Sequence, residues 1–413
     1  MGIVELDLNL TDEQKAIRDA VRKFGAEVMR PAAKELDLLA DPQDVIAPNS
    51  VLWDVFRAYR KLGLHRRGFP EECGGIPGDD IMAGILLREE LSYAACDLSV
   101  SLSVSSFPFR LALLSPDPEV RDWTRRYCED TEIKMIGCWG MTEPDHGSDW
   151  IMAGEPEGQD PRTAPQVRAV KKGNEYIING QKSAWVSNGT IATHTAMGMG
   201  IDHPDGRRTL GYATMPLNLP GVSRGKPLNK LGQRALNQGE IYFENVRIPE
   251  SMMIVADMGA LAAMPGAGLG ATLATANAGM AVSFASVARA AFDEALRYAQ
   301  ERVQGGKPII EHQNIQLKLF DMFKQMEAAR SLARRINIYN AVMPPSLPHS
   351  IAAKVFSTET AFKVASEAVQ IFGGYGLCKD YLIEKLFRDA RAAMIEDGAN
   401  DTLSLVGARR LVD

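Results

Sequence analysis

The sequence predicts an α+β protein with a helical part, a β part and a second helical part, in that order. Apolar residues recur at helical spacing in the first third, for example at Ile17, Val21 and Phe24. Short β-prone segments separated by turn residues then take over, and long amphipathic segments return after about residue 272. These changes of pattern predict domains at residues 1–133, 134–255 and 256–413.

The composition indicates an ordinary globular protein. Of its 413 residues 46% are hydrophobic and 24% charged, and the net charge is −6. The acidic balance argues against a nucleic-acid-binding protein, which usually carries a basic excess. Five scattered cysteines without a C-x-x-C pair are typical of a reduced, cytoplasmic protein. The first ten residues lack the charged-then-apolar pattern of a secretory signal.

The first part contains several predicted helices. Residues 11–36 open with a capping box formed by Thr11 and Gln14. A second helix spans residues 51–63 and ends at a glycine suited to a helix C-cap. Residues 81–96 and 118–130 have the same helical character.

In the second part, residues 133–141 form an apolar run that suits a strand. The pair Asn179-Gly180 lies between β-prone residues, which predicts a tight hairpin turn at that point. Residues 209–217 and 239–249 are expected to be further strands.

The last part opens with residues 258–288, which carry no charge. Glycine and alanine dominate this run and Pro265 interrupts it, so we expect a loop and a buried helix and no membrane span. Long helices are predicted at 286–303, 311–342 and 350–374, and a final one at 399–411.

Two loops are candidates for ligand binding. Residues 141–149, MTEPDHGSD, gather hydroxyls, glycine and proline just after a strand, and could bind a phosphate or a heteroaromatic ring. Trp185 and Ser187 are two apart, which places them on one face of a strand. An ordinary polar turn and a half-buried aromatic residue remain the alternatives. The six histidines are too scattered to predict a metal site.

Taken in order, seven segments resemble the acyl-CoA dehydrogenase family over essentially the whole chain. The resemblance implies an N-terminal helical domain, a middle β barrel and a C-terminal four-helix bundle. The segments are LTDEQ, MTEPDHGSD, YIINGQKSAWVSNG, NKLGQRALNQGEIYFENVRIPESMMI, ERVQGGKPIIEHQNIQLKLFDM, VQIFGGYGLCKDYLIEKLFRDAR and MIEDGANDT.

The resemblance also implies FAD between the β domain and the bundle. The segment Trp139 to Ser148 matches the family's flavin-binding strand and loop, with Met141 and Thr142 near the pyrimidine side of the ring. Ser148 is expected near the pyrophosphate or the pantetheine of the substrate. Trp185 is expected to pack against the ring, and Ser187 to lie near N5. The segment around Trp185 carries one residue more than the usual family pattern.

A second set of residues matches those that a neighbouring subunit lends to the FAD. Arg302 corresponds to the arginine on the FAD diphosphate, a role that suits a planar, permanently charged group. Gly305 stands where phenylalanine is common, so one adenosine contact is expected to be missing. The other members of the set are Gln304, His312, Gln313, Gln370, Gly373 and Gly374.

The catalytic base is expected at Asp397. Many family members have a glutamate before the glycine of an I-Y-E-G-T segment, and here that segment reads Ile395-Glu396-Asp397-Gly398-Ala399. The alternative family position for the base is Ala276, which has no carboxylate. Asn277 and Gly398 are expected at the substrate. Aspartate is one methylene shorter than glutamate, so either the backbone or the substrate lies closer, or the preferred substrate differs from a simple straight chain.

The implied reaction is the dehydrogenation of an acyl-CoA thioester. Asp397 removes the α proton, the β hydrogen passes to flavin N5 as hydride, and an electron-transfer flavoprotein takes the electrons from a homodimer or homotetramer. Two alternatives remain: a flavin oxidase of the same fold resembling nitroalkane oxidase, and a non-catalytic or nucleic-acid-associated relative.

Overall fold

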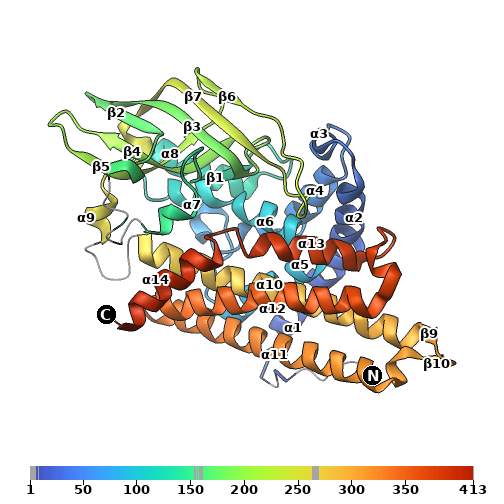
Figure 1. The fold of residues 1–413 in the computed structure, drawn as a ribbon. Coiled ribbons are helices and arrows are strands. Elements are labelled where there is room, and N and C mark those ends of the chain that lie inside the picture. The colour runs from blue at the N-terminus through green and yellow to red at the C-terminus, as the bar shows by residue number, and fades with distance from the viewer. Residues whose placement is uncertain are drawn as a thin grey trace.

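The protein is described here by a computed structural model covering residues 6–7, 9–152, 155, 157, 161–262 and 269–412. Helices come first, a sheet follows, and a helical bundle completes the chain (Figure 1). The first helices are α1 (Asp12–Phe24), α2 (Arg30–Leu38), α3 (Pro42–Val45), α4 (Leu52–Lys61), α5 (Ile81–Ala94), α6 (Cys96–Val104), α7 (Phe107–Ala112) and α8 (Pro118–Glu129).

Local sequence signals explain where several of these helices begin and end. The capping box at α1 is confirmed, because Thr11 accepts from the Gln14 backbone and Gln14 reaches back to the Thr11 backbone. A π-helical turn, Gly25–Met29, joins α1 to α2. Gly63, just after α4, has a φ of +68°, a left-handed conformation that glycine adopts without strain.

The strands in the middle part of the described chain form one eight-stranded sheet. They are β1 (Gly137–Gly140), β2 (Arg168–Lys172), β3 (Glu175–Ser187), β4 (His194–Asp202), β5 (Arg208–Pro216), β6 (Val222–Arg224), β7 (Gln238–Pro249) and β8 (Met253–Val255). Their order is β6-β7-β3-β2-β4-β5-β8, and β1 pairs in parallel with β4.

The predicted hairpin at Asn179-Gly180 is wrong. Both residues lie inside β3, and the chain turns instead between β2 and β3, where Gly173 has a φ of +59°. Gly180 marks a shift in the pairing of β3 with β7, and a Cβ there would lie 2.8 Å from the Cα of Val167. Glycine is therefore needed at this position for a bulge and a close backbone approach.

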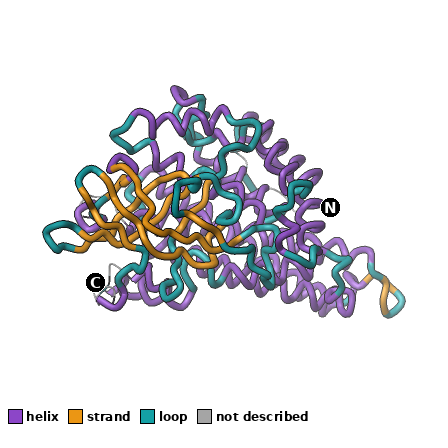
Figure 2. Tube along the Cα trace, turned by 90° about the horizontal axis from the view of Figure 1, so that it is seen from above, coloured by secondary structure: helices purple, strands orange, loops and turns teal. Residues whose placement is uncertain are grey.

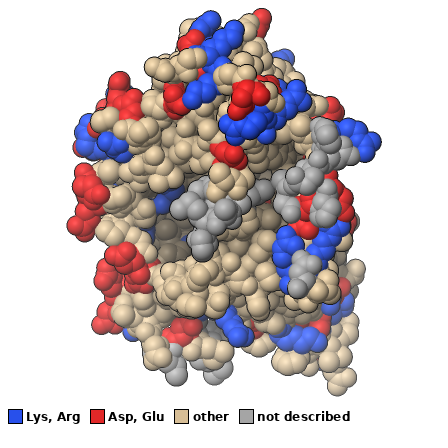
Figure 3. Space-filling model, turned by 90° about the vertical axis from the view of Figure 1, so that its left-hand side faces the viewer, with Lys and Arg blue, Asp and Glu red and all other residues tan. Residues whose placement is uncertain are grey.

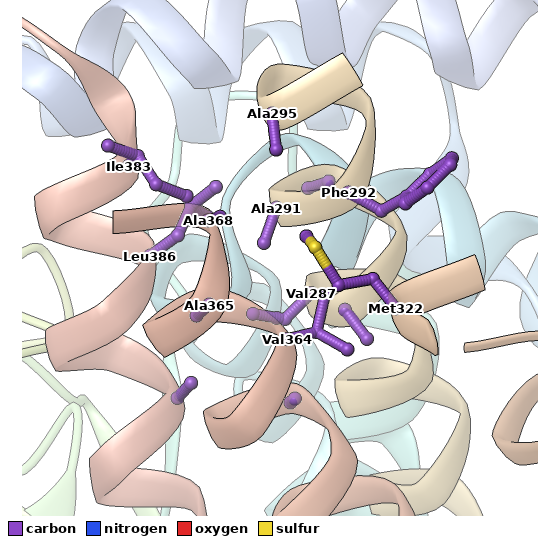
Figure 4. Packing of buried hydrophobic residues seen from close by; sticks show 14 of the residues in the cluster. Val287, Ala291, Phe292, Ala295, Met322, Val364, Ala365, Ala368, Ile383 and Leu386 are labelled. Atoms are coloured by element: carbon purple, nitrogen blue, oxygen red, sulfur yellow. The ribbon is translucent and has the colours of Figure 1, made fainter. Parts of the chain in front are cut away.

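The last part of the chain is a helical bundle with a short hairpin at one end. Its elements are α9 (Met258–Ala262), α10 (Leu269–Glu301), β9 (Val303–Gln304), β10 (Lys307–Pro308), α11 (Gln313–Val342), α12 (Leu347–Phe372), α13 (Leu382–Ala393) and α14 (Asn400–Val412). Alanines of α10 and α12, including Ala291, Ala295 and Ala365, pack between larger residues from α11 and α13 (Figure 4). Small side chains let these helix backbones approach closely.

Helix α10 is the core helix of the bundle. In the described chain Gly270–Glu301 is long and apolar enough, by length and composition, to cross a membrane, but 72% of its most apolar window is buried within the protein. It packs against α5, α11 and α12.

The sheet and the bundle meet where the candidate site lies. From above, the large sheet covers one end of the helices, and the β9–β10 hairpin projects at the opposite end (Figure 2). The segment between α13 and α14 returns to the sheet side, and helix α14 packs against residues 148–152.

Candidate active site

The acidic segment between α13 and α14 is held from two sides. The Lys354 Nζ, from α12, donates to the Gly398 carbonyl and to Asn400 Oδ1, both at 2.8 Å. From the middle part of the chain, Ser148 Oγ accepts from the Ala399 N–H at 2.9 Å. These contacts fix a tight turn in which Asp397 has a φ of +50° and Gly398 a φ of +98°. A left-handed aspartate is uncommon and is often found at functional sites.

The two neighbouring acids of this turn differ in their partners. Glu396 Oε1 accepts from Gln233 Nε2 at 2.5 Å. The Asp397 carboxylate, in contrast, makes no hydrogen bond or ion pair with any residue that the structure describes. Its backbone N–H is likewise unused within the described chain. Asp397 therefore offers both a carboxylate and an N–H to a ligand, while Glu396 is tied to the protein.

Both acids lie in a desolvated setting although each keeps some accessible surface, which is typical of the wall of a cleft. Burial raises the pKa of Asp397, and the positive charges of Lys354 and Arg88 oppose that rise. Burial also raises the pKa of Glu396, to about 7, with repulsion from Asp397 adding to the effect. Seen from the side, the surface is hollowed, with a basic side chain inside the hollow (Figure 3).

A buried hydrogen-bond network positions Glu396. The Gln233 backbone N–H donates to Asp389 Oδ1 at 2.5 Å. Lys385 Nζ donates to Asp389 at 2.5 Å and to Asp97 of α6 at 2.7 Å. The network thus connects the first helices, the middle part and the bundle.

The sheet presents a second group of predicted residues. Trp185 is 54% exposed, which is unusual for so large an apolar surface. Gln238 Nε2 donates to Ser187 Oγ at 3.2 Å and to the Trp185 carbonyl at 3.3 Å, so the Ser187 hydroxyl proton is left for a ligand. The Trp139 indole N–H donates to the Tyr212 hydroxyl, which fixes its ring.

The loop after β1 is attached to β3 by a fully buried ion pair. Lys182 Nζ lies 2.6 Å from Glu143 Oε1 and donates to the Met141 carbonyl at 3.0 Å. The backbone of Thr142 is bonded to that of Ser183 at 2.8 Å. Met141 and Thr142 are thus held beside the strand that carries Trp185 and Ser187.

The remaining predicted cofactor residues lie elsewhere in the chain. They occupy the end of the bundle that carries the β9–β10 hairpin, far from the large sheet (Figures 1 and 2). These residues are Arg302, Gln304, His312, Gln313, Gln370, Gly373 and Gly374. The structure therefore bonds Ser148 to the turn that contains Asp397 and holds Met141 and Thr142 beside the strand of Trp185 and Ser187. It does not bring the second set to the same place within one chain.

The residues in both places fit the parts of FAD that the resemblance assigns to them. Trp185 offers an exposed aromatic surface, and Ser187 offers a donor beside it. The Arg302 guanidinium is exposed, lies over the ring of Tyr375 at 5.6 Å, and has no acceptor among the described residues. Such a group is free to bind a diphosphate.

Asn277 has a different environment from the one expected of a substrate contact. It is fully buried in α10, and its Nδ2 donates to the Leu273 carbonyl of the same helix at 2.9 Å. Its Oδ1 has no partner in the described chain.

Sequence reasoning missed Gln233, Lys354 and Arg88. A signal existed for Lys354, because it shares a helical face with the buried Ile351 and Thr358. Gln233 carries no comparable signal, since its place depends on a loop with a φ of +50°.

Comparison with known proteins places this geometry in a family. Residues 11–114 match the N-terminal domain of acyl-CoA dehydrogenase, residues 138–246 its middle domain and residues 268–412 its C-terminal domain. The fold and the site therefore define a flavoprotein oxidoreductase. More particularly, the chain belongs to the acyl-CoA dehydrogenase family, whose members act on acyl-CoA.

The similarity extends over whole chains. A protein described as a probable acyl-CoA dehydrogenase, YngJ of Bacillus subtilis, is 30% identical and covers 98% of this chain and 100% of its own. The butyryl-CoA dehydrogenase of Megasphaera elsdenii has a TM-score of 0.81 at 26% identity, covering 99% and 100%. A chain in the structure of the electron-transferring flavoprotein of Acidaminococcus fermentans has a TM-score of 0.79 at 27% identity, covering 98% and 99%.

Proposed function

We propose that this protein catalyses the FAD-dependent α,β-dehydrogenation of an acyl-CoA thioester, with Asp397 as the base. One observation carries the assignment of the base. In the acidic turn Asp397 is the carboxylate that no described residue binds, whereas Glu396 is tied to Gln233.

The setting of Asp397 suits removal of an α proton. Desolvation raises the pKa of its carboxyl, which makes the carboxylate a stronger base. The positive charges of Lys354 and Arg88 oppose this rise in pKa. The unused N–H of Asp397 can donate to the thioester carbonyl and stabilise the charge that develops there.

FAD, when bound, would supply the acceptor for the β hydrogen. Trp185 would pack against its ring, and Ser187 would donate a hydrogen bond to it. Arg302 of a second copy would bind the diphosphate, because its position at the far end of the bundle excludes that role within its own chain. An electron-transfer flavoprotein is the acceptor that we propose for the electrons, since a structure of such a protein contains a similar chain.

The test is anaerobic mixing of the holoprotein with a panel of acyl-CoA thioesters while the flavin absorbance is followed. We expect bleaching with at least one thioester in the wild type. The Asp397→Asn variant should lose roughly 10²- to 10⁴-fold in the rate of bleaching, and Asp397→Glu should retain most of it. Asp401→Asn, an exposed change in the first turn of α14, is the matched control.

Two outcomes would contradict the proposal. Full activity of Asp397→Asn would remove the base assignment. Failure of every thioester to bleach the flavin, with peroxide formed from nitroalkanes under oxygen, would favour the oxidase alternative.

A further inference from the structure

A chain of hydrogen bonds leads from Lys230 to Ser187. Lys230 lies in the loop between β6 and β7, and its Nζ donates to Gln238 Oε1 and to the Leu236 carbonyl, both at 2.8 Å. Gln238 is buried at the start of β7. Its Nε2 continues the chain to Ser187 of β3, the residue that pairs with Gln238 in the register of the sheet.

The direction of these hydrogen bonds is fixed at both ends of the Gln238 amide. An ammonium group has only donors, so the amide oxygen must face Lys230. A backbone carbonyl only accepts, so the amide nitrogen must face the Trp185 carbonyl, which lies 3.3 Å from it. The second hydrogen of Nε2 points to Ser187 Oγ, 3.2 Å away. The Ser187 hydroxyl is therefore an acceptor toward the protein.

The hydrogen of the Ser187 hydroxyl has no acceptor among the residues that the structure describes. Ser187 keeps some accessible surface, as does Trp185 on the other side of the buried Val186. An acceptor atom of a ligand would satisfy this hydrogen. A C–H group or a donor in the same place would leave it unbonded, which is unfavourable in a desolvated site.

The loop that carries Lys230 is held from two sides. Arg234 Nε donates to the Asp37 carbonyl at the end of α2, at 2.9 Å. A Cβ built on Gly232 would lie 2.4 Å from the Arg388 carbonyl of α13, so the loop has no room to move toward that helix. Burial lowers the pKa of Lys230 to about 8, which leaves most of it protonated at neutral pH. The donor at this end of the chain thus has a fixed place and a defined charge.

We propose that Lys230 and Gln238 are positioning residues that fix the Ser187 hydroxyl as a donor, so that the site selects a flavin by its acceptor atom N5. The inference rests on the proposed function, in which Ser187 donates to the ring of FAD, and on the expected place of N5 at that hydroxyl. Both residues act through Ser187. The orientation of its hydroxyl decides whether N5 meets a hydrogen or a lone pair.

The test compares FAD with 5-deaza-FAD, in which a C–H group replaces N5 and the rest of the cofactor is unchanged. The readout is the ratio of their Kd values, 5-deaza-FAD over FAD, from calorimetric titration of the full-length protein after its flavin has been removed. We expect this ratio to fall by roughly 3- to 10-fold from the wild type to Ser187→Ala, the loss of one hydrogen bond between neutral groups.

Two further variants test the positioning residues themselves. Gln238→Glu replaces the amide nitrogen with an acceptor oxygen, so the Ser187 hydrogen should turn to the carboxylate and the ratio should fall as far as in Ser187→Ala. Lys230→Met should lower the ratio by a smaller factor, because Gln238 loses the donor that holds its oxygen. Lys226→Met, an exposed change in the same segment, should leave the ratio unchanged.

A merely structural role is separated by repeating both changes in Ser187→Ala. Neither Gln238→Glu nor Lys230→Met should alter the ratio there, because the hydroxyl through which they act is gone. An equal fall of the ratio with and without the Ser187 hydroxyl overturns the inference. So does a ratio that neither change affects in the presence of that hydroxyl.

The result is separable from the proposed function, because binding is measured without a substrate. If acyl-CoA thioesters bleach the flavin and the ratio does not respond to Gln238→Glu or Lys230→Met, the proposed function stands and this inference fails. If the ratio responds as expected and no thioester bleaches the flavin, the orientation of Ser187 is supported and the proposed reaction fails.

Discussion

Glu396 and Asp397 are adjacent carboxyls with opposite hydrogen-bonding states. Gln233 holds Glu396, and the structure leaves Asp397 open to a ligand. Burial raises the pKa of both, and repulsion from Asp397 raises the pKa of Glu396 further. Since the repulsion is mutual, the protonation state of Glu396 must also influence Asp397. We infer that Glu396 is a positioning residue that adjusts the base next to it.

This arrangement predicts a pH-dependent stability. The pKa of Glu396 is about 7 in the folded protein against an ordinary value of 4.5. The folded state thus prefers the neutral carboxyl. The contribution of Glu396 to the free energy of unfolding is fully present below pH 4.5 and is lost as pH rises through about 7. The Glu396→Gln variant cannot ionise at this position. We therefore expect the difference in Tm, variant minus wild type, to be roughly 2–4 °C larger at pH 8 than at pH 5.

Thermal unfolding of both proteins at the two pH values measures this difference. Asp401→Asn is the control and should show the same offset at each pH. A Glu396→Gln offset that does not change with pH would mean that Glu396 is ionised throughout the range.

At this scale the sequence predicted part of the site. The turn containing Asp397 was located by its resemblance to a family segment, and its unoccupied carboxylate agrees with a base. The roles of Lys354 and Arg88 follow from which helices pack together, and a single sequence does not specify that. Both residues nevertheless lie on helical faces with buried apolar neighbours, such as Ile351 and Ile85. A charged residue at such a position is a usable signal.

Among the elements, β3 shows how extra residues are accommodated in a strand. From Lys182 to Val186 the strand advances four residues, while its partner β7 advances two, from Ile241 to Gly239. The extra length forms a bulge that contains Trp185 and ends just before Ser187, and bulges re-aim nearby side chains. The hairpin expected from Asn179-Gly180 failed for a related reason. Glycine there serves a bulge within a long strand, which local turn statistics do not distinguish from a turn.

The buried pair Lys182–Glu143 predicts how firmly the loop after β1 is attached to β3. Lys182→Met would leave the Glu143 carboxylate buried without its cation, so we expect a loss of about 3–5 kcal/mol in the free energy of unfolding. Burial also lowers the pKa of Lys182 to about 8, so the pair should weaken as pH rises above that value. Denaturant unfolding of the variant measures the loss.

Lys171→Met is the matched control on the neighbouring strand. Lys171 pairs with Glu250 in a more exposed position, where an ion pair contributes about 0–1 kcal/mol. Equal losses in the free energy of unfolding in the two variants would show that the buried ion pair contributes no more to stability than the exposed one.

For the whole molecule, the separation of the two sets of predicted cofactor residues has a direct consequence. Trp185 lies at the sheet, Arg302 lies at the far end of the bundle, and one FAD cannot touch both in a single chain. Helix α11 also exposes two large apolar side chains, Leu317 at 72% and Phe320 at 65%. If Trp185 and Arg302 serve one FAD, Arg302 must come from a second copy of the chain.

Mixed oligomers test this arrangement. We expect Trp185→Ala and Arg302→Ala each to bind FAD more weakly than the wild type. The two variants are unfolded, mixed and refolded together. In a mixed pair of chains, one site then combines the intact Trp185 of one chain with the intact Arg302 of the other. FAD binding per chain, measured by fluorescence, should therefore rise above that of either variant alone.

Sedimentation would first establish that the refolded sample is oligomeric. If mixing restores no binding to an oligomeric sample, the two residues do not serve the same FAD across a subunit boundary.

The fold at this scale was predictable because each part has its own periodicity, helical or alternating. The docking of the parts was not, because it depends on buried polar contacts between segments far apart in the chain.

The network from Asp97 through Lys385, Asp389 and Gln233 to Glu396 draws one partner from each of the three parts. Its order of formation is therefore constrained during folding. The acidic turn can acquire its final shape only after the first helices, the sheet and the bundle have all docked. Catalytic activity would then be the last property to appear as the chain folds. It would also be among the first properties lost when any one of the three parts undocks.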